Sequence, residues 1–122
     1  MLSTQIRTFS AVTFLALSFA VHAFPDGAST PAKDEVRLRV ADKSFGVALV
    51  NRTTWRLEFK SSGTFFVNTS TGFNGGGDWN AQDGQLCSKL RGSELVCNDV
   101  RVFEDVLYLK RADGEVIKYT PR

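Results

Sequence analysis

Carboxylates are the side chains of this sequence best suited to catalysis, because a pair of them can serve as acid and base or nucleophile in glycoside hydrolysis. Six candidates lie in the second half of the chain: Asp78, Asp83, Glu94, Asp99, Glu104 and Asp105. Most fall in predicted turns, where Asp is common because its side chain hydrogen-bonds the local backbone. We therefore expect no enzyme, and a carboxylate-dependent hydrolase is the least favoured alternative.

Catalysis or metal binding by histidine is excluded for most of the chain. The only histidine and the only methionine, His22 and Met1, lie in a predicted leader that ends at Ala23. A chain that starts at Phe24 has neither residue. This excludes Ser-His-Asp triads, Cys-His pairs and His-based zinc or copper sites within that chain.

The stretch GGGDWNAQDGQLC invites comparison with metal and phosphate loops. Asp78, Asn80 and Gln82 match positions 1, 3 and 5 of a calcium loop. However, Asp83 stands where that loop needs Gly, and Lys89 stands where it needs Glu. The glycines also lack the Gly-Lys-Ser/Thr ending of a phosphate loop. We expect no metal and no cofactor.

A structural role fits the same stretch better. Gly75–Gly77 allow the chain to bend or bulge, Trp79 packs at a flank of the core, and Asp83-Gly84 forms a tight turn. The alternative is a loop that faces a ligand.

The two cysteines, Cys87 and Cys97, lie symmetrically about Gly92. A hairpin that turns at Arg91-Gly92-Ser93 places them opposite each other, close enough to form a disulfide. Closing so small a loop stabilises a fold by about 2 to 3 kcal/mol. The alternative, a redox dithiol, lacks the Cys-x-x-Cys spacing and any nearby group that lowers a thiol pKa.

The first 23 residues, MLSTQIRTFSAVTFLALSFAVHA, have the pattern of a secretory signal peptide. One positive charge, Arg7, precedes an apolar run from Ala11 to Val21, and Val21-His22-Ala23 is a small-x-small cleavage site. That run is too short to span a bilayer stably. We expect a periplasmic or secreted protein without a stable membrane span.

Charge is nearly balanced along the chain. Fifteen Lys plus Arg, of which Arg7 is in the leader, accompany thirteen Asp plus Glu. Such a balance gives no reason to expect binding to nucleic acid or to an anionic membrane.

A short helix is predicted from about Pro31 to Asp42, after a flexible leader over residues 24–30. Thr30 is a suitable N-cap, and proline is common at the first helical position. The alternation Val-x-Leu-x-Val over residues 36–40 is the competing signal, for a strand.

From Val47 onward, short apolar runs alternate with turn residues about every ten positions, as in an antiparallel meander. Strands are expected over residues 47–50, 54–60, 64–69, 77–81, 85–90, 94–101, 106–110 and 115–120. Seven or eight strands leave two exposed edges unless the sheet curls on itself. We therefore predict a mainly β fold: an antiparallel meander that forms a small barrel or half-barrel, with a short N-terminal helix, as a single domain over residues 31–122.

Most aromatic side chains of so short a chain must fill its core. Phe66 follows another phenylalanine, so one of the two points away from the core, and Phe73 lies in the polar, glycine-rich loop. Phe66, Phe73, Trp79 and Trp55 are therefore candidates to rim a barrel mouth or a partner surface.

The segments TTWRLEFKSSGTFFV, GDWNAQDGQLC and ELVCNDVRV resemble a family of small exported bacterial proteins of unknown function. The shared pattern is G-x-W…DG-x-x-C…C with a Gly-Thr turn, found at Gly77, Trp79, Asp83, Gly84, Cys87, Cys97 and Gly63-Thr64. The resemblance implies a lipocalin-like open barrel and a periplasmic location, and it implies no known activity.

These features predict a non-catalytic, exported binding module, a small lipocalin-like barrel for an unknown small apolar ligand. The alternative is a protein-interaction or inhibitor module that presents the loop of residues 70–78 to an envelope protein. We expect a monomer.

Overall fold

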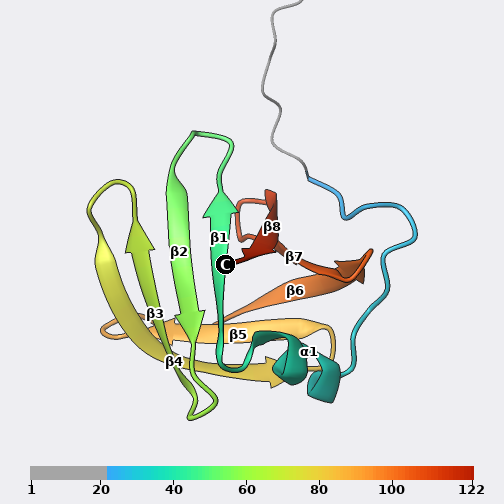
Figure 1. Cartoon of the computed structure of the whole chain (residues 1–122), viewed down its shortest axis with the longest axis horizontal. Helices are drawn as coiled ribbons and strands as arrows, with labels where there is room; N and C mark the ends of the chain where they lie inside the picture. The colour runs from blue at the N-terminus through green and yellow to red at the C-terminus, as the bar shows by residue number, and fades with distance from the viewer. Residues whose placement is uncertain (1–21) are drawn as a thin grey trace, which may run out of the picture.

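The computed structural model describes residues 22–122, and these form one helix and eight strands (Figure 1). The elements are α1 (Lys33–Val40), β1 (Lys43–Ala48), β2 (Thr54–Phe59), β3 (Thr64–Thr69), β4 (Asn74–Gln82), β5 (Gln85–Leu90), β6 (Val96–Phe103), β7 (Val106–Lys110) and β8 (Val116–Pro121). All neighbouring strands are antiparallel, in chain order. The predicted leader, apart from His22 and Ala23, lies outside the described residues.

The mainly β meander with a short N-terminal helix is confirmed, and the sheet closes into a full barrel. Closure comes from β8, which pairs with β1 through Phe45 opposite Pro121 and Gly46 opposite Thr120. The barrel is therefore closed, in contrast to the open barrel that the family resemblance implies. In the closed barrel every strand is paired on both sides, so no unpaired strand edge is left to which another chain could add a strand.

The predicted helix is confirmed as α1, although it begins two residues later than expected. Val36 and Val40, four positions apart, face the barrel and are fully buried. Ala32, at the N-cap, provides no side-chain hydrogen bond. The backbone N–H of Lys33 instead donates to Asp83 Oδ1 at 2.8 Å, so the turn between β4 and β5 satisfies one of the free donors at the start of the helix.

Three predicted strands, over residues 64–69, 85–90 and 106–110, coincide with β3, β5 and β7. The first strand begins four residues earlier than predicted and ends two residues earlier, at Ala48, because Leu49 accepts a turn hydrogen bond from the N–H of Arg52 at 3.0 Å. Its apolar run at positions 47–50 therefore extends beyond the strand into the turn.

The three glycines that were expected to bend or bulge the chain belong to β4. Pairing of Gly75, Gly76 and Gly77 with β3 is continuous, so the prediction of a bulge is wrong, although Figure 1 shows β4 curving strongly around the barrel. A Cβ atom at Gly77 would collide with the backbone carbonyl of Lys89 on β5. Close approach between two backbones is what requires glycine at this position.

α1 covers one end of the barrel. Its hydrogen bonds reach three different turns at that end: the Lys33 N–H donates to Asp83, Arg37 Nη2 donates to the Ser61 carbonyl at 3.0 Å, and Arg39 Nη1 donates to Asp105 Oδ1 at 3.0 Å. In an up-and-down meander the turns after β1, β3, β5 and β7 gather at the opposite end, which α1 does not cover.

The predicted disulfide is confirmed. Cys87 on β5 lies directly opposite Cys97 on β6, and their sulfurs are bonded. Their side chains lie on the outer face, because the inward positions of β5 belong to Leu86 and Ser88. The bond therefore fastens two neighbouring strands from outside the barrel.

The sequence predicts a flexible leader over residues 24–30. In the structure these residues run beside β6. Ser29 forms an isolated antiparallel bridge with Val102, with N–H to carbonyl distances of 2.8 and 2.9 Å. The Arg101 guanidinium lies 5.2 Å from the centre of the Phe24 ring. Among residues 22–122, no helix has the length and apolar character needed to cross a membrane.

Candidate functional site

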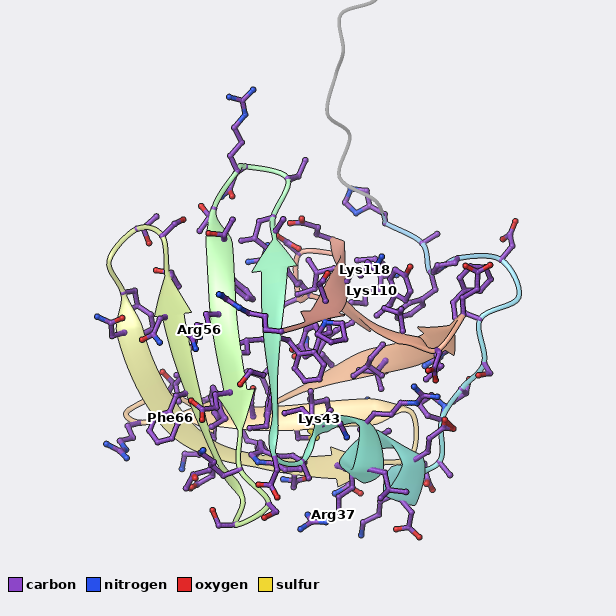
Figure 2. The ribbon with its side chains drawn as sticks, in the orientation of Figure 1. Arg37, Lys43, Arg56, Phe66, Lys110 and Lys118 are labelled. Atoms are coloured by element: carbon purple, nitrogen blue, oxygen red, sulfur yellow. A yellow bond between two sulfur atoms is a disulfide. The ribbon has the colours of Figure 1, made fainter. Side chains whose placement is uncertain are left out.

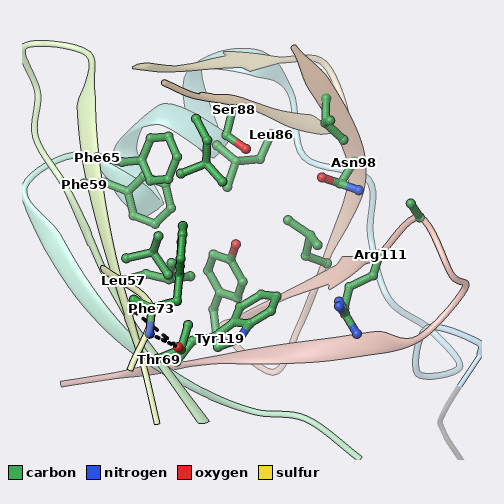
Figure 3. Close-up of a pocket in the computed structure, with 16 residues that line it drawn as sticks. Leu57, Phe59, Phe65, Thr69, Phe73, Leu86, Ser88, Asn98, Arg111 and Tyr119 are labelled. Carbon is green, nitrogen blue, oxygen red and sulfur yellow. Dashed lines mark hydrogen bonds between the residues drawn. The ribbon is translucent and has the colours of Figure 1, made fainter. Parts of the chain in front are cut away.

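A cavity of about 340 Å³ occupies the barrel interior (Figure 3). Its deepest side chains include Phe59, Phe65 and Leu86, which stand near the α1 end of their strands. Its outermost lining residues, Phe73 and Ala112, belong to turns at the uncovered end. The barrel is therefore filled beside α1 and hollow beneath the opposite turns, and this volume is at the lower end of ligand pockets in proteins.

Aromatic rings form one side of this cavity. On this side, the centroid of the Phe59 ring lies 6.0 Å from that of Phe65 and 6.2 Å from that of Tyr119. Both ring pairs are stacked. Trp55 and Phe73 continue the aromatic lining toward the mouth. Such a surface offers flat, weakly polar faces to a ligand.

Two small polar side chains line another part of the wall. Ser88 on β5 and Asn98 on β6 point inward, across the cavity from Phe59 and Phe65 (Figure 3). The Asn98 amide nitrogen donates to the Lys110 carbonyl at 3.1 Å, which leaves its amide oxygen for other partners.

Tyr119 places a hydroxyl in the cavity. The residue is only 5% exposed, and Figure 3 shows the hydroxyl pointing into the open space. Among residues 22–122 this hydroxyl has no hydrogen-bond partner, although every fully enclosed polar side-chain atom of that part of the chain has one. Burial raises the pKa of Tyr119 well above its ordinary value, so the group is a neutral O–H donor.

Arg111, at the mouth, is the one charged side chain that residues 22–122 contribute to the lining. Its guanidinium lies 5.1 Å from the centre of the Trp55 ring, and its Nη1 donates to Asp113 Oδ2 at 3.1 Å and to Glu115 Oε1 at 2.9 Å. Glu115, itself 6% exposed, also accepts the backbone N–H of Val50 at 2.9 Å. The carboxylates of Asp113 and Glu115 thus offset the positive charge of Arg111. Glu115 also links the turn between β7 and β8 to the turn between β1 and β2.

Phe73 forms part of the rim and is 51% exposed. Its backbone N–H donates to Thr69 Oγ1 at 3.1 Å, and its carbonyl accepts the Thr69 N–H at 2.8 Å (Figure 3). Its ring passes over Gly75, where a Cβ atom would stand 2.8 Å from the ring carbon Cζ. The absent side chain at Gly75 therefore lets Phe73 reach the cavity.

The four aromatic residues predicted to contact a ligand or partner divide into two pairs. Trp55 and Phe73 line the cavity. Trp79 is buried below it, where its Nε1 donates to the Lys60 carbonyl at 2.8 Å. Phe66 is 41% exposed on the outer face of β3 (Figure 2).

Several lining residues were not singled out from the sequence: Phe59, Phe65, Ser88, Asn98, Arg111 and Tyr119. The alternation along each strand carries the signal for most of them, since every second residue of a barrel strand faces inward. For Phe59, Phe65 and Tyr119 the sequence predicted only a place in the core.

The loop predicted as an interaction segment, residues 70–78, is partly strand. Residues 74–78 are paired in β4, so only residues 70–73 form a free turn. None of the six candidate carboxylates lines the cavity. Within residues 22–122 there is also no group of three or more His, Cys, Asp and Glu placed to hold a metal ion.

Comparison with known proteins finds no family model, no curated protein and no solved structure that matches this chain. The resemblance to small exported bacterial proteins therefore stays a prediction.

Proposed function

We propose that this protein binds a small, mainly apolar molecule inside its barrel and carries out no chemistry on it. The observation that carries the proposal is the hollow half of the barrel, lined by aromatic and aliphatic side chains with a few inward polar groups. Ligand pockets are usually built in this way, at the mouth of a barrel among other places. A barrel that served only as scaffold would gain stability by filling this space.

The proposal includes a periplasmic or secreted location. The disulfide between Cys87 and Cys97 supports it, because such bonds persist in oxidising compartments outside the cytoplasm. The predicted leader supports it independently.

A neutral fluorescent probe tests the proposal. N-phenyl-1-naphthylamine is titrated into the purified protein, and we expect a saturable gain of fluorescence at one probe per chain. Leu90→Trp, which places a large ring in the cavity lining, is expected to weaken probe binding at least tenfold.

Lys89→Trp is the matched control, because Lys89 is the neighbour of Leu90 on β5 and faces outward. Melting curves establish that both variants are folded. Absence of probe binding to the unaltered protein, or an equal loss in both variants, would contradict the proposal.

A further inference from the structure

Resting on the proposed function, we infer that the cavity selects an uncharged ring compound with one hydrogen-bond acceptor, such as a carbonyl oxygen, which the Tyr119 hydroxyl binds. The inference names the chemical class of ligand. It depends on three properties of the lining: flat faces, a deeply buried unpartnered donor and a balanced charge.

The flat faces come from Phe59, Phe65 and Tyr119, which stack in sequence at interplanar angles of 23° and 28°. Aromatic rings prefer offset-stacked or edge-to-face partners. A planar or alicyclic ring therefore matches this lining better than a long flexible chain, which also loses more conformational entropy on binding.

Two inward hydroxyls of the lining, those of Tyr119 and Ser88, have no hydrogen-bond partner among residues 22–122, and Tyr119 is the more buried residue. A polar group that is nine-tenths buried normally has a hydrogen-bond partner within the protein or in ordered water. No fully enclosed side-chain polar atom of residues 22–122 lacks a partner, so the unpartnered Tyr119 hydroxyl is open to the cavity into which it points (Figure 3). A ligand oxygen placed there supplies the missing acceptor, whereas a hydrocarbon leaves the hydroxyl unpaired.

The charge of the lining disfavours an ionised ligand. Arg111 is already bonded to Asp113 and Glu115, and no other charged side chain of the described part of the chain lines the cavity. A carboxylate or ammonium group moved into this space would lose its hydration without gaining a counterion.

A matched pair of probes tests the inference: 1-acetylnaphthalene, which carries a carbonyl, and 1-ethylnaphthalene, which does not. Their affinities are measured by displacement of N-phenyl-1-naphthylamine from the unaltered protein and from Tyr119→Phe. We expect Tyr119→Phe to weaken the ketone about two- to tenfold and to leave the hydrocarbon unchanged, as loss of one hydrogen bond predicts. 1-Naphthoate is expected to bind more weakly than the ketone.

Tyr119→Phe keeps the ring that packs 5.2 Å from Phe45, so the fold is expected to survive. Tyr108→Phe is the control, because Tyr108 lies on the outward-facing side of β7. Equal effects of Tyr119→Phe on ketone and hydrocarbon, or a naphthoate that binds as tightly as the ketone, would overturn the inference while leaving the proposed function intact. If the dye binds but neither 1-acetylnaphthalene nor 1-ethylnaphthalene displaces it, the inference is also overturned, whereas failure of the protein to bind the dye would refute the proposed function itself.

Discussion

Glu115 shows how one residue organises the mouth of this barrel. Its two carboxylate oxygens have different partners, the guanidinium of Arg111 and the backbone N–H of Val50. These partners belong to the turn between β7 and β8 and the turn between β1 and β2. Because Glu115 is buried, both interactions are made where water competes poorly for them.

Replacing Glu115 by Ala is expected to lower the free energy of unfolding by about 1 to 3 kcal/mol, because a buried acceptor is lost and its donors are left unpaired. Urea denaturation measures the change. Glu58→Ala is the comparison: its ion pair with Lys60 is about half exposed to solvent, which screens the interaction, so its loss is expected to cost clearly less than that of Glu115. Similar losses for the two variants would argue against a special role for Glu115.

At the residue scale, sequence patterns anticipated the aromatic rim only in part. Phe73 is a candidate because it lies in a polar, glycine-rich loop, and Trp55 because a tryptophan could join it at a barrel mouth. Trp79 was grouped with them, but it belongs to the core under α1, where Arg37 lies 5.6 Å from the centre of its ring. That difference depends on which end of the barrel each strand residue occupies, and local patterns carry no information about it.

Among the elements, α1 depends most on contacts distant in sequence. It has only eight residues, too few to be stable alone in water. The acidic residues Asp34 and Glu35 in its first turn and the basic residues Arg37 and Arg39 in its last suit the helix dipole. Burial of Val36 and Val40 and the cap from Asp83 provide the rest.

Asp83→Ala is therefore expected to destabilise the protein by about 0.5 to 2 kcal/mol, the usual effect of removing a helix cap. Thermal melting followed by circular dichroism gives the value. Asp99→Ala provides the comparison, because Asp99 is also exposed but bonds only the Gln85 side chain, and we expect a change within about 0.5 kcal/mol. An Asp83 variant as stable as the Asp99 variant would show that the cap contributes nothing.

The strands were largely predictable, because alternation and turn residues are local signals. Strands β3, β5 and β7 follow from them directly, and so does the facing of Cys87 and Cys97. Gly77 begins the strand predicted over residues 77–81, whereas Gly75 and Gly76 were not predictable as strand, since glycine weakens a strand on its own. Only contact with the neighbouring backbone of β5 explains Gly77 there.

For the molecule as a whole, the backbone pairing closes the barrel independently of the disulfide. The double variant Cys87→Ser/Cys97→Ser is therefore expected to keep the fold but to lose about 2 to 3 kcal/mol of stability, from the freedom regained by the unfolded chain. Denaturant titration measures the loss. Because the bond lies outside the barrel, dye binding at a temperature where the variant is folded is expected to be unchanged, and loss of binding would contradict this placement of the bond.

The cavity itself could not be read from the sequence. Alternation predicts which side chains point inward, but the empty volume depends on how the whole set fills a closed cylinder. The sequence left open whether the sheet closed at all. Closure depends on pairing between Phe45–Gly46 and Thr120–Pro121, two segments at opposite ends of the meander.

That seam also sets an order of events during biosynthesis. Each strand from β2 to β8 pairs with the strand that precedes it along the chain, so the sheet is able to grow as the polypeptide lengthens. β1, by contrast, waits with one edge unpaired until β8 has been made, and until then the nascent chain has no enclosed interior. If the protein binds a molecule inside the barrel, as proposed, binding must therefore follow translation of β8.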